Sequence, residues 1–598
     1  MGGLPMTDRS DSAQGPRDPQ DGASGGANDG TIEGASDEGL VTADDGDAGA
    51  EYAGRLDVAR TEPEREPQVL PALRGWDAPW SELSVAVAGL GLSGFAAADT
   101  LAELGARVVV VDSGTGDRQR RSAETLGLVG VDDVRLGAEH AETLPLVDGA
   151  APDVLVTSPG WRPDSTLIVQ AAAHGVPVWS EVELAWRLGP RPGAKDPDWL
   201  VLTGTNGKTT TVRLLESMLV AADLRAVACG NVGMPVLDAI RDPEGYDALA
   251  VELSSFQLHY TELLDPVASA VLNVAEDHVD WHGSFAAYCA DKARIFENTR
   301  VACVYNADSP LTERMVVEAE VQEGCRAIGF TTDAPGPSMV GVVDDVLADR
   351  AYLVARRSRA LELGLLSDFG PAAPQHLVAD ALAAAALARA AGVAPEAVQA
   401  GIRTHEPGEH RIQPVAQSGD VFWVNDTKAT NPHAAKASLT SFSDVVWIAG
   451  GLPKGVDYDE LVAAAAPRLR HVVLLGTDSS QLRSSLRRHA PGVSVVGGGV
   501  RDDDDDGRPD RSTAPLERRL ADVDGREAMR AAVEEASRVA EPGQTVLMAP
   551  AAASMDQFTS YATRGEAFIE AVAELMDRLG HRRPADAGTT DPGTTPEA

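Results

Sequence analysis

The chain has 598 residues, more than one hydrophobic core usually serves, so we expect three or four domains. Hydrophobic residues make up 43% of it, enough for ordinary globular folding. Lys and Arg number 51 against 91 Asp and Glu, a formal net charge of −40, which argues against nucleic acid or an anionic membrane as the main partner. A phosphorylated small molecule stays compatible with this charge, because phosphate sites are local and often built from backbone N–H groups.

The cysteine pattern and the N-terminus indicate the cellular compartment. Cys229, Cys289, Cys303 and Cys325 form no C-x-x-C pair, so we expect no zinc cluster, no disulfide framework and a reducing cytoplasm. The N-terminus is polar and acidic, so we expect no signal peptide. No apolar run reaches the roughly 20 residues of a membrane span. We therefore expect a cytoplasmic monomer with small-molecule substrates, no nucleic-acid partner and no membrane insertion.

Three segments are too polar to fold by themselves. Residues 1–78 are rich in Gly, Asp, Ala and Glu, and such a segment cannot bury enough apolar surface to offset its chain entropy. We predict a disordered acidic tail there and a second tail at 583–598. Residues 497–515 contain Asp502 to Asp506 and are predicted to be a loop insertion whose adjacent like charges stay solvated.

Between the tails, short β-branched runs alternate with helical stretches, which predicts parallel α/β units. The expected strands are 84–88, 108–111, 199–203, 248–252, 267–274, 421–424, 445–449, 472–475 and 545–548. The expected helices include 211–220 and the Ala-rich 379–391, predicted to be buried and amphipathic. Pro192 to Pro197 is predicted to be a linker, and a second boundary is expected near Glu406 to Gly408.

The first glycine-rich motif is Gly89-Leu-Gly-Leu-Ser-Gly94, with Asp112 about 20 residues further on. This spacing is the fingerprint of a dinucleotide-binding fold, in which the acid holds a ribose or base. The motif alone is a weak signal. NAD is the obvious ligand, but a uridine nucleotide would use the same crevice.

The second glycine-rich motif is the strongest in the chain. Gly204-Thr-Asn-Gly-Lys-Thr-Thr210 follows an apolar strand and opens a helix, which is the context of a phosphate loop. In such a loop Lys208 reaches the terminal phosphates and the Thr209 hydroxyl binds Mg²⁺. The longer form of the motif would need Gly at position 202, where this chain has Leu.

Acids and one histidine follow the neighbouring strands. Glu252 ends one strand, and His278 comes soon after another. Ligands of open α/β sheets bind outside the carboxyl ends of the strands, so Glu252, His278 and the phosphate loop are predicted to meet at one metal–phosphate site. Taken singly, each is more often a structural or solvated residue. The position of Lys292 in the sequence does not by itself indicate a role for it.

The last polar cluster lies in the third α/β unit. Asn425 to Asn431 follows a strand and is preceded in the chain by His410 and Arg411. Lys454 and Ser554 lie in similar loops. An ordinary turn is the simplest interpretation of each loop taken alone.

Together these residues resemble the Mur ligase family, over roughly Leu83 to Gly580. The motifs that carry the resemblance are 252–258 (ELSSFQL), 273–278 (NVAEDH), 425–431 (NDTKATN), 554–558 (SMDQF) and 564–565 (RG), together with the short phosphate loop typical of the family. SSFQL combined with DTKATN resembles the member that adds D-glutamate to UDP-N-acetylmuramoyl-L-alanine.

The resemblance implies an α/β fold of three domains. They are a Rossmann-like UDP-sugar domain at 79–191, a central P-loop ATPase domain at 198–407, and a Rossmann-like amino-acid domain at 408–582. It implies an ATP- and Mg²⁺-dependent ligase of cytoplasmic peptidoglycan synthesis, a step of cell-wall biogenesis on which cell shape and division depend. The substrate carboxylate would become an acyl phosphate, which the amine of D-glutamate attacks.

The resemblance also implies roles for individual residues. The UDP-sugar substrate would be bound by Leu92, Ser93, Asp112, Ser113, Ser158, Gly160 and Asn231. ATP would be bound by Gly204, Thr205, Asn206, Gly207, Lys208, Thr209, Thr210, Arg411 and Asp426. Metal ligands would be Thr209, Glu252, His278 and Lys292, the last as a carbamate, and the catalytic residues Lys208, His278 and Lys292. Glutamate would be bound by Thr430, Lys454, Ser554 and Tyr561.

Two sites depart from the family pattern. The stretch His376-Leu-Val-Ala-Asp380 stands where the family has H-N-x-x-N, in which an Asn contacts adenine, so this contact is expected to be altered or lost. Tyr561 stands where Phe is common. Three other functions stay open on the sequence: a sister ligase for another amino acid or for folate, a nicotinamide-dependent dehydrogenase, and a non-catalytic nucleotide-binding scaffold.

Overall fold

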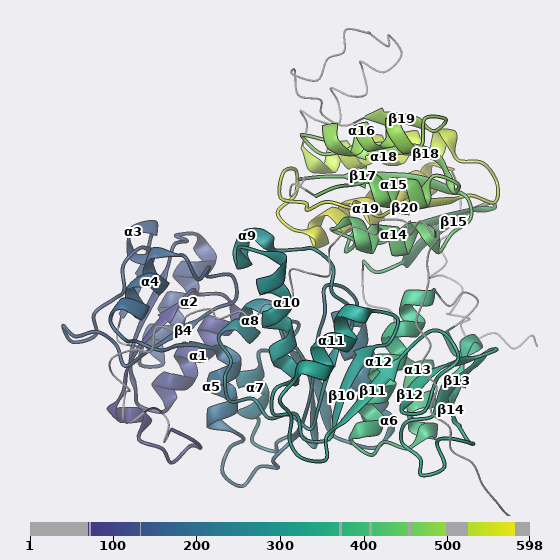
Figure 1. Cartoon of the computed structure of the whole chain (residues 1–598). Coiled ribbons are helices and arrows are strands. Elements are labelled where there is room, and N and C mark those ends of the chain that lie inside the picture. Colours follow the sequence, from purple (N-terminus) through teal and green to yellow (C-terminus); the bar gives the residue numbers. More distant parts are fainter. Residues whose placement is uncertain are drawn as a thin grey trace, which may run out of the picture. The chain divides into compact units, whose positions relative to one another are not determined.

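The computed structural model describes residues 70, 73–131, 133–369, 374–405, 410–452, 456–497 and 524–579. Residues 61–598 form one compact unit, and their described elements build three β-sheets (Figure 1). The predicted second tail, most of the first tail and the predicted loop insertion beyond Gly497 lie outside the described residues.

The end of the predicted first tail is folded. Leu70 and Leu73 are 5% and 0% exposed, and the Trp76 indole donates to the carbonyl of Gly189 over 3.1 Å. The Arg187 guanidinium donates to the carbonyl of Leu70 over 2.9 Å. The predicted boundary at residue 78 is therefore too late, because these apolar side chains bury enough surface to be held.

The first sheet is wholly parallel, with strand order β3-β2-β1-β4-β5. The chain goes outward from β1 to β3 and returns to the other side of β1, so the order reverses between β1 and β4. Its strands are β1 Ser84–Ala88, β2 Arg107–Asp112, β3 Asp133–Leu136, β4 Val154–Thr157 and β5 Val178–Ser180. Its helices are η3 Trp80–Glu82, α1 Leu92–Glu103, α2 Asp117–Leu128, α3 Ala138–Ala141, α4 Thr166–Ala173 and α5 Glu181–Leu188.

The central sheet has nine strands in the order β14-β13-β12-β11-β10-β9-β6-β8-β7. The pairs from β11 to β7 are parallel, whereas β12-β13 and β13-β14 are antiparallel. The strands are β6 Asp198–Thr203, β7 Ala226–Gly230, β8 Ala248–Glu252, β9 Ala268–Val271, β10 Ala302–Asn306, β11 Arg326–Phe330, β12 Met339–Val343, β13 Val346–Asp349 and β14 Leu361–Leu365. The helices are α6 Lys208–Ala221, α7 Val236–Ile240, α8 Ser255–His259, α9 Val279–His282, α10 Phe285–Ala293, η4 Arg294–Phe296, α11 Pro310–Glu318, η5 Leu366–Phe369, α12 Gln375–Ala390 and α13 Pro395–Thr404.

The Ala-rich helix α12 is buried on more than one face. The ten residues from Ala379 to Ala388 are all buried except Ala379, and α12 packs against α6, β9, β10, β11 and β12. The sequence predicted an amphipathic helix here, but small side chains let neighbours approach α12 from several directions. Helices α6 and α12 thus form the core beneath the phosphate loop.

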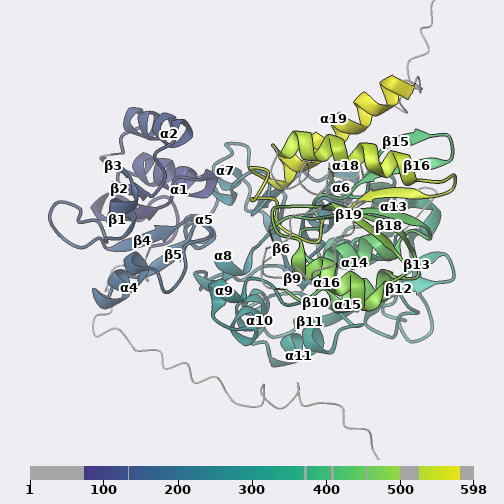
Figure 2. The ribbon, with the colours of Figure 1, turned by 90° about the horizontal axis from the view of Figure 1, so that it is seen from above.

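The third sheet has the order β15-β16-β20-β17-β18-β19, antiparallel only between β15 and β16. Helices α18 and α19 cover one face, and α14, α15 and α16 cover the other (Figure 2). The strands are β15 Gln413–Ser418, β16 Val421–Asn425, β17 Val445–Gly450, β18 Leu469–Leu475, β19 Ser494–Gly497 and β20 Thr545–Met548. The helices are α14 Pro432–Thr440, α15 Asp459–Ala465, α16 Ser480–His489, α18 Gly525–Val539 and α19 Tyr561–Leu579.

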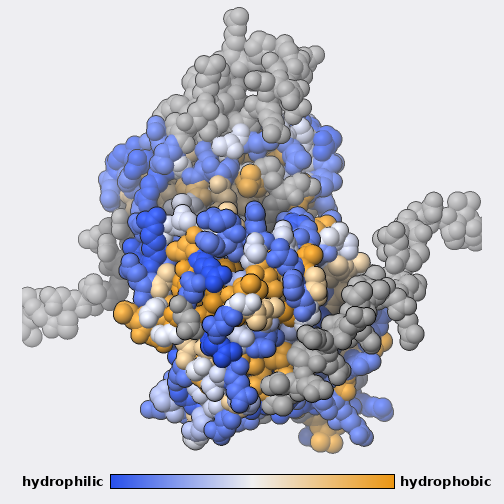
Figure 3. All heavy atoms as spheres, turned by 90° about the vertical axis from the view of Figure 1, so that its left-hand side faces the viewer, coloured by the Kyte–Doolittle hydropathy of each residue, from blue (hydrophilic) through white to orange (hydrophobic). Residues whose placement is uncertain are grey.

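The surface mixes polar and apolar residues, as one face of the molecule shows (Figure 3). Among the described helices, none is long and apolar enough to cross a membrane. Leu92, the first residue of α1, is 65% exposed.

Candidate active site

The glycine-rich turn after β1 lies where the strand order of the first sheet reverses. A Cβ at Gly94 would lie 1.9 Å from the carbonyl oxygen of Gly89, so only glycine lets α1 approach the turn this closely. The Ser158 hydroxyl, which follows β4, donates to the same carbonyl over 3.3 Å. Ligands of open α/β sheets bind at such reversal points.

Most of the residues predicted to bind the nucleotide sugar lie at or beside this turn, whereas Asn231 lies after β7 and donates to Glu252. Asp112, at the end of β2, accepts the backbone N–H of Leu90 over 2.6 Å through one carboxylate oxygen and that of Gly114 over 2.7 Å through the other. Asp112 therefore holds the turn in shape. Leu92, Ser93 and Ser113 lie in the adjoining segments, Leu92 and Ser113 exposed and Ser93 half-buried.

The segment after β4 contacts the central sheet. The Trp281 indole donates to the carbonyl of Gly160 over 3.3 Å. A narrow pocket lies here, lined by Thr157, Ser158, Pro159, Gly160, Trp161, Ser180, Phe256, Gln257 and Tyr260. The Tyr260 hydroxyl is buried and has no hydrogen-bond partner among the described residues.

The phosphate loop runs from Gly204 to Gly207, between β6 and α6. Gly207 has φ +81°, and a Cβ there would lie 2.2 Å from a carboxylate oxygen of Asp380, so this position requires glycine. The Asn273 side chain accepts the N–H of Asn206 over 2.9 Å and donates to its carbonyl over 3.1 Å. The strand β9 was predicted to end at Val274 but ends at Val271. Asn273 is bonded to the phosphate loop, so the chain leaves the sheet before it.

Thr209, in α6, and Glu252, at the end of β8, lie beside this loop. The Thr209 hydroxyl donates to Glu252 Oε2 over 2.8 Å, and the Asn231 amide donates to Glu252 Oε1 over 3.2 Å. Three of the predicted residues, from α6, β8 and the turn after β7, therefore meet around one buried carboxylate. Oxygen donors of this kind fit Mg²⁺, which is usually held by one or two carboxylates plus phosphate oxygens and water. No cluster of three or more His, Cys, Asp or Glu suited to a metal occurs among the described residues.

Two lysines converge on one carbonyl. The ammonium groups of Lys208 and Lys292 each donate to the carbonyl oxygen of Gly204 over 2.8 Å. Lys292 is 2% exposed. Burial, and then the charge of Lys208, lower its pKa well below the ordinary lysine value. The Lys292 amine is therefore more often neutral and nucleophilic than a surface lysine.

His278 contacts Phe256, which lines the narrow pocket. It has a positive φ of 54° at the start of α9, and its ring contacts Phe256 at 4.9 Å and Tyr288 at 6.3 Å between centroids. The Tyr288 hydroxyl lies 3.0 Å from the Thr205 hydroxyl. Tyr288 thus connects His278 to the phosphate loop.

The third domain reaches the phosphate loop through Arg411. The Arg411 guanidinium donates to the Thr210 hydroxyl over 3.2 Å. Asp426 is buried and accepts the N–H of Ile412 over 3.3 Å and the hydroxyl of Ser438. Asp426 therefore holds the backbone beside Arg411 in place.

Of the predicted glutamate residues, Thr430 and Ser554 follow β16 and β20, and Tyr561 begins α19. Ser554 is 3% exposed, and its carbonyl accepts the N–H of Phe558 over 2.8 Å. The Tyr561 ring lies 3.8 Å from the Lys428 ammonium. Thr430 is half-buried two residues after Lys428. Lys454 lies outside the described residues.

Comparison with known proteins identifies the family. A model of the Mur ligase middle domain matches residues 202–388, and a model of the Mur ligase glutamate ligase domain matches residues 410–552. A Streptomyces coelicolor protein named UDP-N-acetylmuramoylalanine--D-glutamate ligase is 52% identical over 491 residues, which cover 82% of this chain and 98% of that one. A Leifsonia xyli protein of the same name is 47% identical over 538 residues, covering 87% and 99%.

The chain belongs to the Mur ligase family. This confirms the resemblance found in the sequence and the α/β fold with parallel-rich sheets that it implied. Membership also argues against the dehydrogenase interpretation of the first glycine-rich motif, because relatives named as ligases align with 82% and 87% of the chain.

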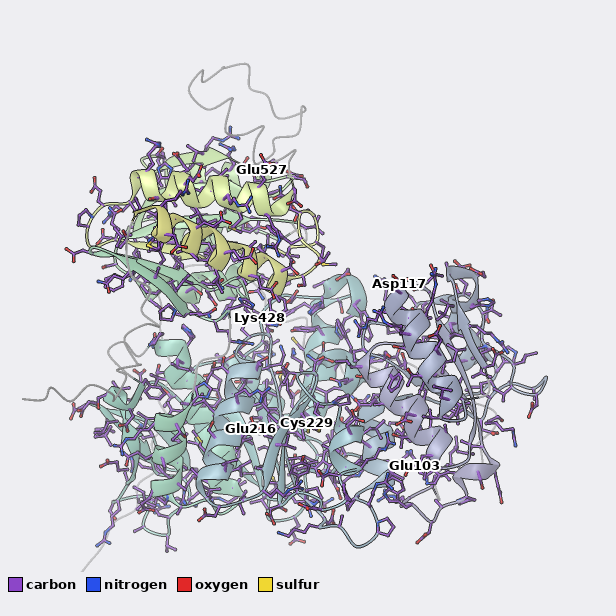
Figure 4. All side chains as sticks on the ribbon, turned by 180° about the vertical axis from the view of Figure 1, so that it is seen from behind. Glu103, Asp117, Glu216, Cys229, Lys428 and Glu527 are labelled. Atoms are coloured by element: carbon purple, nitrogen blue, oxygen red, sulfur yellow. The ribbon has the colours of Figure 1, made fainter. Side chains whose placement is uncertain are left out.

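Sequence reasoning gave no role to Lys428 and did not foresee the place of Asp380 in this Mur ligase site. Lys428, labelled in Figure 4, lies in the loop after β16, and its charge and that of Arg411 add to burial in lowering the pKa of Lys208. Three cations thus lie within electrostatic reach of each other, an arrangement that suits a polyphosphate. In the sequence, the only indication of a role for Lys428 was its position inside the DTKATN motif.

Asp380 is the second residue whose place was not foreseen. It packs against Gly207 of the phosphate loop, is 7% exposed, and burial raises its pKa to about 7, against the influence of Arg411. The departure from the family motif therefore puts an acid beside the phosphate loop.

Proposed function

We propose that this chain joins D-glutamate to UDP-N-acetylmuramoyl-L-alanine with hydrolysis of ATP, in cytoplasmic peptidoglycan synthesis. The proposal is carried by the meeting of Lys208, Arg411 and Lys428 at the phosphate loop, together with relatives named for this reaction at 52% and 47% identity. The four cysteines are free, which fits a reducing compartment.

The substrate carboxylate is a poor electrophile, so the reaction has to activate it. A carboxylate oxygen attacks the γ-phosphorus of ATP, the bond to the β-phosphate oxygen breaks, and an acyl phosphate and ADP form. Lys208, Arg411 and Lys428 offset the negative charge that spreads over the phosphoryl oxygens. The amine of glutamate then attacks the acyl carbon, loses a proton, and phosphate leaves.

Mg²⁺ would be held by Thr209 and Glu252, with Asn231 orienting the Glu252 carboxylate. When bound, Mg²⁺ neutralises phosphate charge and polarises the phosphoryl group. His278 is proposed to complete this site from α9.

Lys292 is proposed to carry a carbamate. Its neutral amine would attack CO₂ and lose a proton, which replaces a buried cation by a carboxylate-like group. The low pKa of Lys292 and its position at the carbonyl of Gly204 support this assignment.

The UDP-sugar is proposed to lie along the turn formed by Leu92, Ser93, Asp112 and Ser113 and to continue past Ser158 and Gly160. The exposed Leu92 side chain offers an apolar face to the base, and the Asp112 and Ser158 bonds keep the turn preformed. Glutamate is proposed to bind Thr430, Lys454, Ser554 and Tyr561 in the third domain.

Lys208→Ala tests the phosphate-loop assignment. We expect phosphate release to fall by at least about 100-fold, since Lys208 supplies charge stabilisation that water cannot replace, while the thermal unfolding midpoint stays near that of the unaltered chain. Lys436→Ala, which removes an exposed lysine paired with Glu460, should leave turnover unchanged. Turnover that survives Lys208→Ala would refute the assignment.

A further inference from the structure

Arg564 is a buried arginine with a full set of partners. It lies in the first turn of α19 and is 1% exposed. Its Nε donates to the Thr427 hydroxyl over 3.0 Å, its Nη1 to the carbonyls of Gly450 and Ala553 over 3.4 and 3.3 Å, and its Nη2 to those of Thr427 and Ala552 over 3.2 and 3.1 Å. A guanidinium has five N–H donors, so none is left over.

The acceptors belong to three loops at one edge of the third sheet. Thr427 follows β16, Gly450 ends β17, and Ala552 and Ala553 follow β20. These strands are neighbours in the order β16-β20-β17, so their carboxyl ends lie side by side. The loops after β16 and β20 lead within three residues to the proposed glutamate-binding residues Thr430 and Ser554, respectively.

Two glycines allow close packing around Arg564. A Cβ at Gly451 would lie 2.9 Å from Arg564 Nη1 and 2.2 Å from the carbonyl of Ala553, and a Cβ at Gly565 would lie 2.4 Å from His410 Nδ1. Burial lowers the pKa of Arg564 to about 9, so the group stays charged at neutral pH at some cost in desolvation. A buried charge bonded only to uncharged oxygens is tolerated where its hydrogen bonds are complete.

We propose that Arg564 is the positioning residue of the amino-acid pocket, holding the three loops after β16, β17 and β20 in register. This rests on the proposed function, because the roles of Thr430, Lys454 and Ser554 belong to it. Arg564 itself is not required to touch glutamate. Lysine cannot replace Arg564. An ammonium carries its three N–H donors on one nitrogen, so it cannot bond to acceptors on three loops at once.

The test compares Arg564→Lys with Arg530→Lys, which alters an exposed arginine paired with Glu574. We expect Arg564→Lys to raise KM for D-glutamate at least about 10-fold while KM for ATP and for the UDP-sugar change less than about 2-fold, and Arg530→Lys to change none. Equal rises in all three KM values, or no rise, would overturn the proposal. Absence of D-glutamate-dependent turnover in the unaltered chain would instead refute the proposed function.

Amide hydrogen exchange tests whether Arg564 orders the three loops, without an activity assay. In Arg564→Lys we expect faster exchange at 427–431, 450–452 and 551–554, with exchange in β18 and α16 unchanged. If Arg564→Lys fails to fold, Thr427→Val, which removes the hydroxyl acceptor of Nε, should give a smaller rise in the same loops. Exchange that is faster throughout the third domain, or nowhere, would contradict a positioning role.

A second observation concerns Cys303 and Cys325. Cys303 lies in β10, Cys325 directly precedes β11, and their Sγ atoms are 3.7 Å apart. Cys303 is buried, whereas Cys325 is partly exposed. The Cys303 thiol hydrogen-bonds to Cys325 and thereby lowers the pKa of Cys325, which favours its thiolate as the attacking group.

We infer that Cys303 and Cys325 close to a reversible disulfide when the protein meets a peroxide. The Cys325 thiolate attacks one peroxide oxygen, the O–O bond breaks and a sulfenic acid forms with release of water. Cys303 sulfur then attacks the sulfenic sulfur, the S–S bond forms and a second water leaves. The two thiols are oxidised by two electrons, which the peroxide takes up.

Hydrogen peroxide followed by mass spectrometry tests this pair. We expect the folded chain to lose about 2 Da, with Cys303 joined to Cys325 in one cross-linked peptide pair and the loss reversed by dithiothreitol. Cys229→Ser should behave like the unaltered chain, and Cys325→Ser should lose no mass. Oxygen addition without a disulfide, or a disulfide to another cysteine, would overturn the inference.

Discussion

Asp380 shows how one residue changes the charge at a nucleotide site. An Asn at this position would be neutral at every pH, whereas Asp380 lies against Gly207 with its pKa raised to about 7 by burial. Its charge therefore changes across the pH range in which the protein would work. The sequence revealed the departure from the family motif, but it could not reveal the burial that gives the departure its effect.

Asp380→Asn should remove a pH dependence of stability. The folded pKa of Asp380 is raised above its unfolded value, so the protonated form favours folding and this contribution is lost as pH rises from about 4 to about 7. We expect Asp380→Asn to raise the free energy of unfolding at pH 8 by up to about 4 kcal/mol, and by little at pH 4. Denaturant unfolding at both pH values measures this, with exposed Asp577→Asn as control. An equal effect at both pH values would contradict it.

At the scale of elements, nine of the twenty described strands were predicted near their observed positions, whereas the other eleven, β10 to β14 among them, and the loop contacts were not. Runs such as Ser84–Ala88, Ala248–Glu252 and Thr545–Met548 have the predicted limits, because continuous β-branched and apolar runs identify buried parallel strands. The pairing of Asn273 with Asn206, and the reach of Arg564 into three loops, depend on contacts between residues 67 and 137 positions apart. No local pattern encodes such contacts.

The contact between α6 and α13 gives an element-scale prediction. A Cβ at Gly401 would lie 2.5 Å from Met218 Cα, and backbone cannot yield as a side chain can. Gly401→Ala should therefore push α13 from α6 and lower the free energy of unfolding by about 1–3 kcal/mol. It should also raise KM for ATP, because α6 begins at Lys208. Gly127→Ala in α2, where a Cβ meets nothing within 4 Å, should stabilise by up to about 1 kcal/mol. Equal effects of the two substitutions would contradict this.

At the scale of the molecule, the first and central sheets are joined by buried polar bonds. Glu183 pairs with Arg187 over 2.8 Å and accepts the N–H groups of Glu262 and Leu263 over 2.7 and 3.0 Å. Nearby, Arg241 of the central domain pairs with Glu103, labelled in Figure 4, over 2.8 Å. The division into sheets followed from the strand pattern, whereas this joint could not, since its acids and arginines resemble solvated surface charges in sequence.

Glu183→Gln tests the joint. It leaves the Arg187 charge buried and weakens the bonds to the 262–263 segment, so we expect a loss of about 3–5 kcal/mol in the free energy of unfolding. Glu534→Gln, which breaks an exposed pair with Arg578, should cost no more than about 1 kcal/mol. If both substitutions lower the free energy of unfolding by the same amount, the bonds of Glu183 do not hold the two domains together.

The central claim is the reaction itself, and phosphate release from ATP tests it most directly. The purified chain would be given Mg²⁺, ATP and UDP-N-acetylmuramoyl-L-alanine, with D-glutamate, L-glutamate or no amino acid. We predict release that depends on D-glutamate and is absent with L-glutamate. Release with another amino acid but with neither glutamate would contradict the claim and make the chain a sister ligase, and no release from folded protein under any condition would contradict catalysis altogether.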